Sequence, residues 1–377
     1  MKPELALRLL GGLMKWEFLR ANEEFKWLNL LVEYKYDHYQ GYSPGARFLI
    51  NLINWLKQFP TVEKREVAYK FIRERLVFIN QREMHHLIDL SMPLFDCEAR
   101  RLVAKELGLK FYETWNDVNA ARRLRLLKMR TLYVALSDGA HIDIFRRDNE
   151  GDVSNEQVVP LAEISPQKWE SLFGKLRKRL DAEDFSNEDA LFERICLIDD
   201  FTGSGFTLVR FDNGKWDGKV HNFCHQCETN GEMGTRVKKG CTVHVHHYLA
   251  STKAKESITQ ELERYEKSSA NFSFTKTFSY VLPQDIVVSH EDNDQELVSL
   301  ISEFYDESIQ STHTITHTSD NISYGYRQCG LPLVLDHNTP NNSVALLWAK
   351  SKDSSVSPQK MRPLFHRKER HIDHGKK

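Results

Sequence analysis

The sequence predicts an α/β protein with a mostly parallel sheet, preceded by an all-helical N-terminal domain. From Met1 to about Arg130, apolar residues recur at three- and four-residue spacing, which is typical of packed helices. Beyond Arg130, short apolar runs alternate with helical patterns, and this alternation favours a parallel sheet. The 377 residues include only 18 Gly and 11 Pro, which favours long elements over a turn-rich all-β fold.

The N-terminal third is expected to contain several short helices. A clear helical pattern begins at Ala46 and continues through apolar residues to Leu56. Gly or Pro disfavours continued helix at residues 41–45, 59–60 and 91–93. Further helices are predicted over residues 97–107, which Gly108 would cap, and over residues 115–127.

The period changes after Arg130, where a compact apolar run over Thr131–Leu136 predicts a buried strand. Ser137, Asp138 and Gly139 follow this run and predict a tight loop. Later strands are predicted over residues 195–198, 242–249, 285–289 and 331–335. The helices between them are predicted over residues 165–180, 253–267 and 295–309.

These patterns divide the chain into three parts. Residues 1–129 form the helical N-terminal domain, and residues 130–350 form the α/β domain with an insertion near residues 213–240. Residues 351–377 form a C-terminal hood extension that ends in a basic tail.

Charge and cysteine content exclude several classes of protein. Lys and Arg number 52 against 53 Asp and Glu, so the overall field does not attract a polyanion, and we do not expect nucleic acid as a direct ligand. Six scattered cysteines do not form a disulfide framework, which favours a cytoplasmic location. No run of 18 apolar residues is present, so membrane spanning is not expected.

The most informative segment begins with the apolar run Ile195–Ile198, which leads directly into Asp199 and Asp200. In an open α/β sheet, ligands bind at the carboxyl ends of the strands, so these two acids are expected at a ligand site. A loop rich in glycine and hydroxyl side chains follows, and a helix is predicted from Thr207 to Arg210. The loop residues expected to cradle a phosphate are Thr202, Gly203, Ser204, Gly205 and Thr207. The alternative is an ordinary strand-to-helix turn capped by Asp and Thr.

This segment, LIDDFTGSGFT, resembles the signature of the phosphoribosyltransferase family. The resemblance implies a type I-like phosphoribosyltransferase fold and a ligand such as phosphoribosyl pyrophosphate or a related ribose 5-phosphate nucleotide, bound with Mg²⁺. It implies that Asp199 and Asp200 are the catalytic acids that contact the ribose hydroxyls and that the loop holds the 5′-phosphate. Gly203 and Thr202 depart from the family's usual residues, which puts phosphate affinity in doubt.

A second loop of that family follows its first strand and binds pyrophosphate. Asp138 and Gly139 occupy the corresponding position and are candidate ligand residues by resemblance. A common Ser-Asp-Gly turn is the equally weighted alternative. Asp138 and His337 are candidates for a general base, but the sequence assigns none.

Near the C-terminus, a predicted strand ends in a polar loop that contains several Asn residues. Asn338, Asn341 and Asn342 could bind a nucleobase or phosphate, and Trp348 could stack on a base; the alternative is an Asn/Pro turn with Trp348 in the core. The order of helical region, LIDDFTGSG, HNTPNN, LLW and RPLF resembles divergent bacterial phosphoribosyltransferase-like proteins of anti-phage and other conflict systems. This resemblance implies an effector role and specifies no substrate.

Two other patterns leave alternatives open. Cys224, Cys227, Cys241 and His244 have zinc-ligand spacing, but a strand over 242–249 would separate the last two, and an exposed loop is favoured. Basic residues between 122 and 130 could contact nucleic acid, but a solvated helix face is favoured.

The favoured function is enzymatic: phosphoribosyl transfer, or a nucleosidase-like glycosyl transfer. The alternative is a non-catalytic sensor that binds the same class of ligand and regulates a protein partner through the helical domain.

Overall fold

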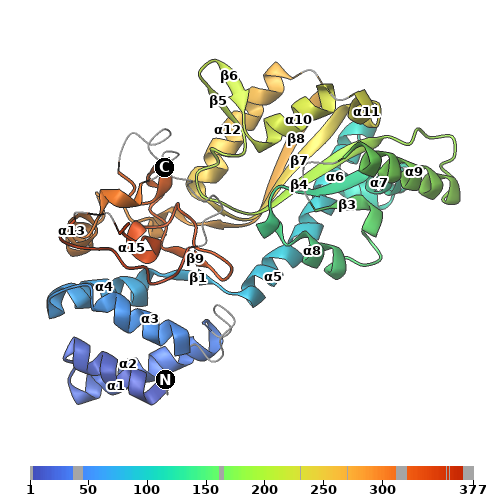
Figure 1. Cartoon of the computed structure of the whole chain (residues 1–377). Coiled ribbons are helices and arrows are strands. Elements are labelled where there is room, and N and C mark those ends of the chain that lie inside the picture. Colours follow the sequence, from blue (N-terminus) through green and yellow to red (C-terminus); the bar gives the residue numbers. More distant parts are fainter. Residues whose placement is uncertain are drawn as a thin grey trace. The chain divides into compact units, whose positions relative to one another are not determined.

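A computed structural model describes residues 3–36, 46–160, 165–229, 231–269, 271–310, 321–353, 355 and 357–367. The chain divides into two compact units, shown in Figure 1. We call Met1–Glu83 with Pro283–Lys377 the terminal unit, and Met84–Leu282 the sheet unit. The boundaries of these units differ from the predicted domain boundaries, because the C-terminal segment packs with the N-terminal helices.

The terminal unit has a helical core joined to a small two-stranded sheet. Its apolar core combines residues from α1, α3 and α4 with residues of the C-terminal segment, among them Trp55, Leu346 and Phe365. Strand β1 pairs in parallel with β9, and Val77 is opposite Leu333. The elements of this unit are α1 (Pro3–Met14), α2 (Phe18–Tyr34), α3 (Ala46–Leu56), α4 (Val62–Arg75), β1 (Val77–Ile79), η5 (Gln284–Ile286), α13 (Gln295–Glu303), η6 (Glu307–Ile309), η7 (Tyr326–Gln328), β9 (Leu333–Leu335) and α15 (Ala345–Trp348), while α5 (Gln81–Asp89) contains the unit boundary.

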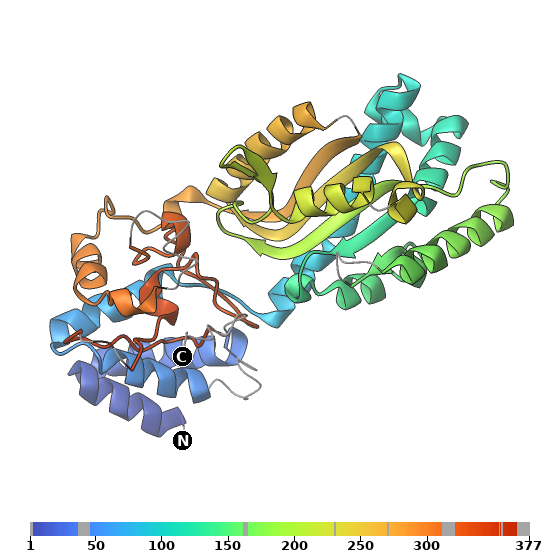
Figure 2. The same ribbon diagram turned by 45° about the horizontal axis from the view of Figure 1, so that its top comes forward.

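The sheet unit is built on a five-stranded parallel sheet with the strand order β3-β2-β4-β7-β8 (Figure 2). This confirms the predicted α/β class. The strands are β2 (Thr131–Ala135), β3 (Val158–Val159), β4 (Phe192–Thr202), β7 (Val237–Ser251) and β8 (Phe272–Leu282). The chain enters at β2, adds β3 on one side and then adds β4, β7 and β8 on the other. The order therefore reverses between β2 and β4, which is where such sheets place ligands.

Two helical layers cover the sheet. Helices α9 (Pro166–Ala182), α10 (Lys219–Thr229) and α12 (Thr252–Ser268) pack on one face through an apolar core, which we call the apolar face. On the opposite face, which we call the polar face, α6 (Ser91–Leu107) and α8 (Ile142–Asp148) contribute Phe95 and Phe145 to an aromatic group with Tyr133 of β2. The remaining elements are η2 (Phe111–Trp115), α7 (Val118–Met129), η3 (Asp138–Ala140), η4 (Asn155–Gln157), β5 (Arg210–Asp212), β6 (Lys215–Asp217) and α11 (Gly231–Gly234).

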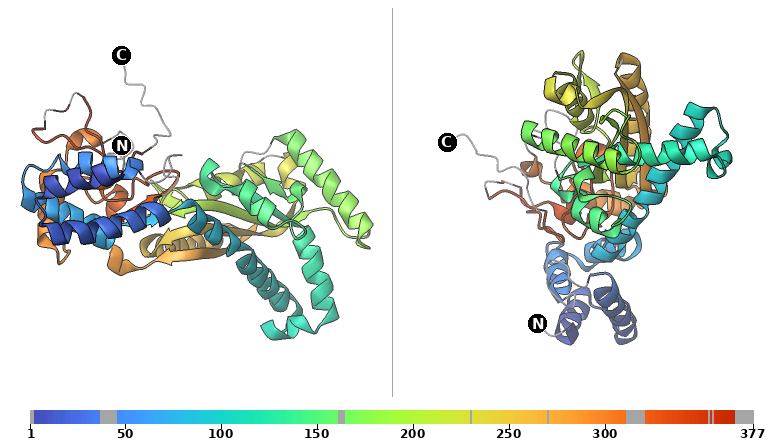
Figure 3. Two further views of the ribbon diagram at one scale, coloured as in Figure 1. Left: turned by 90° about the horizontal axis from the view of Figure 1, so that it is seen from below. Right: turned by 90° about the vertical axis from the view of Figure 1, so that its right-hand side faces the viewer.

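Helices α6 and α7 form a pair that projects from the sheet (Figure 3). Three of the four basic residues of α7 are ion-paired, whereas exposed Arg122 lies over the ring of Phe185. Arg123 lies 2.9 Å from Glu106, and Lys128 lies 2.9 Å from Asp96. Arg130 is 4% exposed and pairs with Glu188 and Glu193. Carboxylates therefore neutralise most of the predicted basic run.

Two predicted elements are wrong, and a third forms but pairs with another strand than expected. Residues 285–289 form no strand; a 3-10 turn stands there, and Val288 N donates to Gly330 O. Thr207–Arg210 is not helical but leads into the antiparallel hairpin β5–β6. The predicted strand at 331–335 forms as β9 but pairs with β1 rather than with the five-stranded sheet. The break predicted at residues 41–45 and the end of the basic tail lie outside the described residues.

In the described part of the chain, every helix is too short or too polar to cross a lipid bilayer.

Candidate functional site

The acidic pair lies at the point where the strand order of the sheet reverses. Asp199 and Asp200 are in β4, and Ser137, Asp138 and Gly139 follow its neighbour β2. Leu136 N donates to Ile198 O over 2.8 Å, which extends the β2–β4 pairing up to this loop. Ser137 and Asp199, which are 62 positions apart in the sequence, are thereby brought into hydrogen-bonding distance.

Asp199 is buried, and both of its carboxylate oxygens are hydrogen-bonded. Ser137 Oγ and the backbone N of Asp200 donate to Oδ1, and Lys219 Nζ donates to Oδ2 over 2.6 Å. Burial raises the pKa of the Asp199 carboxyl above its usual value, although the Lys219 ammonium opposes that shift. The 5% exposed side chain is thus a desolvated acid held in one orientation.

Asp200 lies against the loop that follows β2. A Cβ added to Gly139 would lie 2.6 Å from Asp200 Oδ2, so only glycine fits at this position without moving the carboxylate. Asp200 is 6% exposed, whereas Asp138 is exposed at the start of η3. The structure therefore brings Gly139 to the acidic pair and leaves the Asp138 side chain in solvent.

Strand β7 contributes two buried groups beside the acidic pair. His247 is opposite Asp199 in the β4–β7 pairing and is 2% exposed. Burial lowers its pKa to about 3, the nearby Lys219 adds to that shift and Asp200 opposes it, so the imidazole is neutral at pH 7. Tyr248 is fully buried, and its pKa is raised by burial and by the charges of Asp200 and Asp199.

The predicted phosphate loop packs on the first turn of α12. Ser251 caps α12 by accepting from Ala254 N, and its Oγ also donates to Gly203 O over 2.6 Å. Gly205 has φ +72°, and a Cβ there would lie 3.0 Å from Ile258. The first turn of α12 therefore holds the loop in place, and glycine is required at position 205.

The hydroxyl residues of this loop differ in exposure. Thr202 is 7% exposed and Ser204 9% exposed, while Thr207 is exposed. Lys219 N donates to Thr207 O and Val220 N to Leu208 O, so the first turn of α10 is joined to the end of the loop. The β5–β6 hairpin stands between loop and helix, so the loop is not directly continued by a helix as the sequence predicted.

The predicted hood residues lie in the terminal unit. Asn342 Nδ2 donates to Tyr326 O, Asn341 O accepts from Tyr326 N, and Asn338 forms a bridge with Leu335. Trp348 Nε1 donates to Ser343 O, and its ring packs against the core. These contacts are those of a turn. That any of the four residues shares a ligand site with the acidic pair stays a prediction.

The four residues with zinc-ligand spacing do not lie together in the structure. Cys241 faces the core with Cys224 and Cys227, whereas His244, three residues along β7, lies on the opposite face and bonds Thr275 and Thr277. Burial raises the pKa of Cys227 to about 12 and raises that of Cys241 well above its usual value, which disfavours thiolates. Among the described residues, no group of three or more His, Cys, Asp or Glu is arranged to hold a metal ion.

Sequence reasoning missed Lys219, Ser137 and His247. Ser137 could have been found, because it directly follows a predicted strand that neighbours the acidic pair. His247 lies within a predicted strand, but the pairing that places it opposite Asp199 is not visible in the sequence. Lys219 follows Asp199 by 20 residues, and no local pattern indicates its contact.

One comparison with known proteins gives a match. The model of the PRTase-CE family, a phosphoribosyltransferase-like family, matches residues 52–367. The chain belongs to the PRTase-CE family. That match includes the acidic pair, the loop at 202–207 and the Asn-rich turn, so it confirms the resemblance found in the sequence. No curated protein and no solved structure matches the chain.

Proposed function

We propose that this member of the PRTase-CE family binds a ribose 5-phosphate compound, such as phosphoribosyl pyrophosphate or a nucleotide, at the carboxyl ends of β2 and β4. The observation that carries the proposal is the convergence of Asp199, Asp200, Ser137 and Gly139 at the point of strand reversal. Two buried carboxylates repel each other, so an acidic pair retained at such a point is best explained by a ligand that uses it.

Each group has a role in this proposal. Asp199 and Asp200 accept hydrogen bonds from the ribose hydroxyls, since carboxylates are acceptors only. The loop of Thr202, Gly203, Ser204, Gly205 and Thr207 donates hydroxyls and backbone N–H groups to the 5′-phosphate. Lys219 supplies a positive charge beside the pair. Its ammonium pairs with the Asp199 carboxylate and would also attract a phosphate.

The acidic pair also fits Mg²⁺ that arrives with the ligand. Mg²⁺ is commonly held by one or two carboxylates together with substrate phosphates. Asp199 and Asp200 are the residues we assign to hold the ion, with Lys219 beside them. The ion would neutralise phosphate charge when bound.

The enzymatic form of the proposal is transfer at C1 of the ribose. Positioning by the acidic pair and neutralisation of phosphate charge would supply most of the acceleration. Incubating the chain with Mg²⁺, phosphoribosyl pyrophosphate and each nucleobase should release pyrophosphate. Nucleotides without an acceptor test for nucleosidase activity in the same assay.

The second candidate is a non-catalytic sensor, and two observations favour it. Both Asp199 oxygens are already compensated by the protein, which suits binding without turnover. Helices α1 and α2 also expose large apolar side chains, including Phe18 at 83% and Leu19 at 78%, a surface that a protein partner could cover. Saturable binding without pyrophosphate release or nucleotide cleavage would support the sensor and contradict the enzyme.

The control for both measurements is the exposed acidic pair at the end of α9. Asp181→Asn with Asp184→Asn changes the net charge as the double substitution at Asp199 and Asp200 does, and it should leave binding and turnover unchanged. An effector role in anti-phage defence and a cytoplasmic location stay predictions.

A further inference from the structure

A second cleft lies at the opposite end of the same sheet. Two adjoining cavities of about 350 and 440 Å³ share Ser154, Glu156 and Arg179. Met129 precedes β2, Gln157 precedes β3 and Phe192 begins β4, so the first cavity lies at the amino ends of these strands. Each volume is within the range of small-molecule sites.

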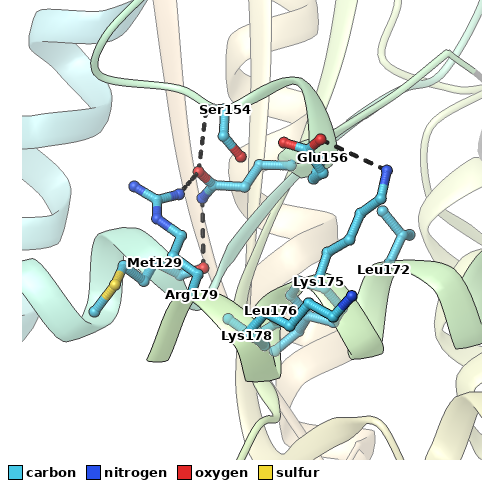
Figure 4. A pocket seen from close by; sticks show the side chains of 10 residues that line it. Met129, Ser154, Glu156, Leu172, Lys175, Leu176, Lys178 and Arg179 are labelled. Atoms are coloured by element: carbon cyan, nitrogen blue, oxygen red, sulfur yellow. Dashed lines mark hydrogen bonds and ion pairs between the residues drawn. The ribbon is translucent and has the colours of Figure 1, made fainter. Parts of the chain in front are cut away.

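The first cavity is lined by four apolar side chains and six polar or charged ones, most of which are labelled in Figure 4. Its lining includes Met129, Leu172, Leu176 and Phe192, each at most 5% exposed. A methionine thioether, two leucines and one aromatic ring line this cavity, and they would contact the apolar part of a ligand that enters it.

The rim and the second cavity are rich in positive charge. The lining of the two cavities together contains five cationic side chains and two carboxylates, those of Glu150 and Glu156. The cationic residues are Arg146, Arg147, Lys175, Lys178 and Arg179. Such an excess favours an anion carrying more than one negative charge.

Two of the arginines bond neutral amides. Arg179 Nη1 donates to Gln157 Oε1 over 2.5 Å, and Arg146 Nη1 donates to Asn155 Oδ1 over 2.7 Å. Gln157 is 5% exposed and is itself fixed, because its Nε2 donates to Lys128 O and Thr131 O. A buried amide thus orients Arg179 at the junction of the two cavities without neutralising it.

The ion pairs in the cleft are at the surface. Lys175 lies 3.6 Å from Glu156, Arg179 lies 3.6 Å from Glu183, and Arg147 pairs with Asp143. Their members are 28–66% exposed, and ion pairs between exposed side chains contribute little to stability. A phosphate can therefore compete for these cations.

We propose that this cleft binds a nucleoside monophosphate or a similar phosphorylated aromatic compound. The ring lies on the apolar lining beside Phe192, and the phosphate contacts Arg179 and the arginines of α8. Guanidinium groups match phosphate oxygens through paired hydrogen bonds. Strands β2 and β4 run from this cleft to the acidic pair, so the two sites lie at opposite ends of the sheet.

Calorimetry with AMP tests the proposal in a chain that carries Asp199→Asn and Asp200→Asn, which removes the proposed ribose site. AMP should bind this chain, and inorganic phosphate should bind at least tenfold more weakly because it lacks the ring. Adding Arg147→Glu with Lys178→Glu, both exposed, should weaken AMP binding at least tenfold. The control Lys255→Glu, an exposed charge reversal on α12, should leave it unchanged.

Three results would overturn the proposal: no saturable AMP binding to the Asn variant, equal affinity with and without the two charge reversals, or equal affinity for AMP and phosphate. Thermal unfolding of each variant checks that it is folded. Loss of ribose-phosphate binding at the acidic pair alone would leave this cleft intact, so the two proposals fail independently.

Discussion

The two faces of the five-stranded sheet are closed by different physical means. On the apolar face, side chains such as Leu197, Val243 and Val245 pack against α9, α10 and α12. On the polar face, the alternate residues of β4 and β7 include Arg194, His244 and His246, all at most 2% exposed. Burying apolar area is favourable by itself, whereas buried polar groups must find hydrogen bonds.

A ladder of hydrogen bonds meets that requirement on the polar face. His244 Nδ1 and Nε2 bond Thr275 and Thr277, and His246 Nδ1 and Nε2 bond Thr277 and Ser279, over 2.7–3.1 Å. Phe95 covers both imidazoles edge to face. The comparison teaches that one face depends chiefly on packed area, while the other depends on neutral, correctly oriented imidazoles. The following predictions test that difference.

Phe95→Ala should have the largest effect. The ring is fully buried and contacts Tyr133, Phe145 and both imidazoles, so its loss should lower the free energy of unfolding by about 4 kcal/mol. On the apolar face, Val245→Ala should cost about 2 kcal/mol, since it removes two methyl groups. Urea denaturation of the two variants compares the faces, and equal losses would contradict the account.

Low pH should have the next largest effect. Burial lowers the pKa values of His244 and His246 on the polar face and of His247 on the apolar face, whereas an unfolded histidine has a pKa near 6.5. Below about pH 6.5 the unfolded chain binds protons that the folded chain does not, so stability falls as pH falls. The raised pKa of Asp199 acts in the opposite direction. Arg194, Lys219 and Asp200 are the charged groups that influence these imidazoles.

The expected loss is about 1 kcal/mol for each histidine between pH 7.5 and 5.5, or about 3 kcal/mol in all. Urea denaturation at pH 7.5, 6.5 and 5.5 measures it. His244→Gln with His246→Gln should remove most of the pH dependence, and Val245→Ala should retain it. A stability that does not change over this range would show that the imidazoles are not held neutral by the fold.

Thr277→Val should have a smaller effect. Thr277 Oγ1 contacts both His244 Nε2 and His246 Nδ1, so the valine leaves two buried ring nitrogens each without that partner. The expected cost is about 2 kcal/mol. The matched change His246→Gln keeps a polar group in the ladder and should cost less. An unchanged unfolding midpoint in Thr277→Val would contradict the importance of the ladder.

Arg194→Met should have the smallest effect, with the opposite sign. Arg194 Nη1 donates to Phe95 O over 3.0 Å, but its Nε and Nη2 are buried without a hydrogen-bond partner. An apolar side chain of similar length avoids burying that charge, so the free energy of unfolding should rise by about 1 kcal/mol. A loss above 1 kcal/mol would show that the guanidinium stabilises the polar face.

The sequence predicted the apolar face better than the polar one. The apolar run at 195–198 and the acids after it were sufficient to place β4 and its carboxyl end. Strand β8 was missed, although Phe272, Phe274 and Phe278 alternate with Ser and Thr, because the segment has no continuous apolar run. The separation of Cys241 and His244 by a strand was expected from the sequence, but the exposed loop favoured for the four residues is wrong, because Cys224 and Cys227 are buried in α10.

Long-range pairing explains the remaining differences. The pairing of β9 with β1 joins residues more than 250 positions apart, and the C-terminal segment accordingly packs with the N-terminal helices. Local patterns carry no information about such partners. The contact between Lys219 and Asp199 is of the same kind, since it depends on where a hairpin returns the chain.

Ribose-phosphate recognition by the acidic pair is tested most directly by calorimetry with phosphoribosyl pyrophosphate and Mg²⁺. The unmodified chain should bind with a stoichiometry near one at the acidic pair. Asp199→Asn with Asp200→Asn should weaken that binding at least a hundredfold while the unfolding midpoint stays within a few degrees. Undiminished binding in the double variant, or its failure to fold, would contradict a ligand role for the two carboxylates.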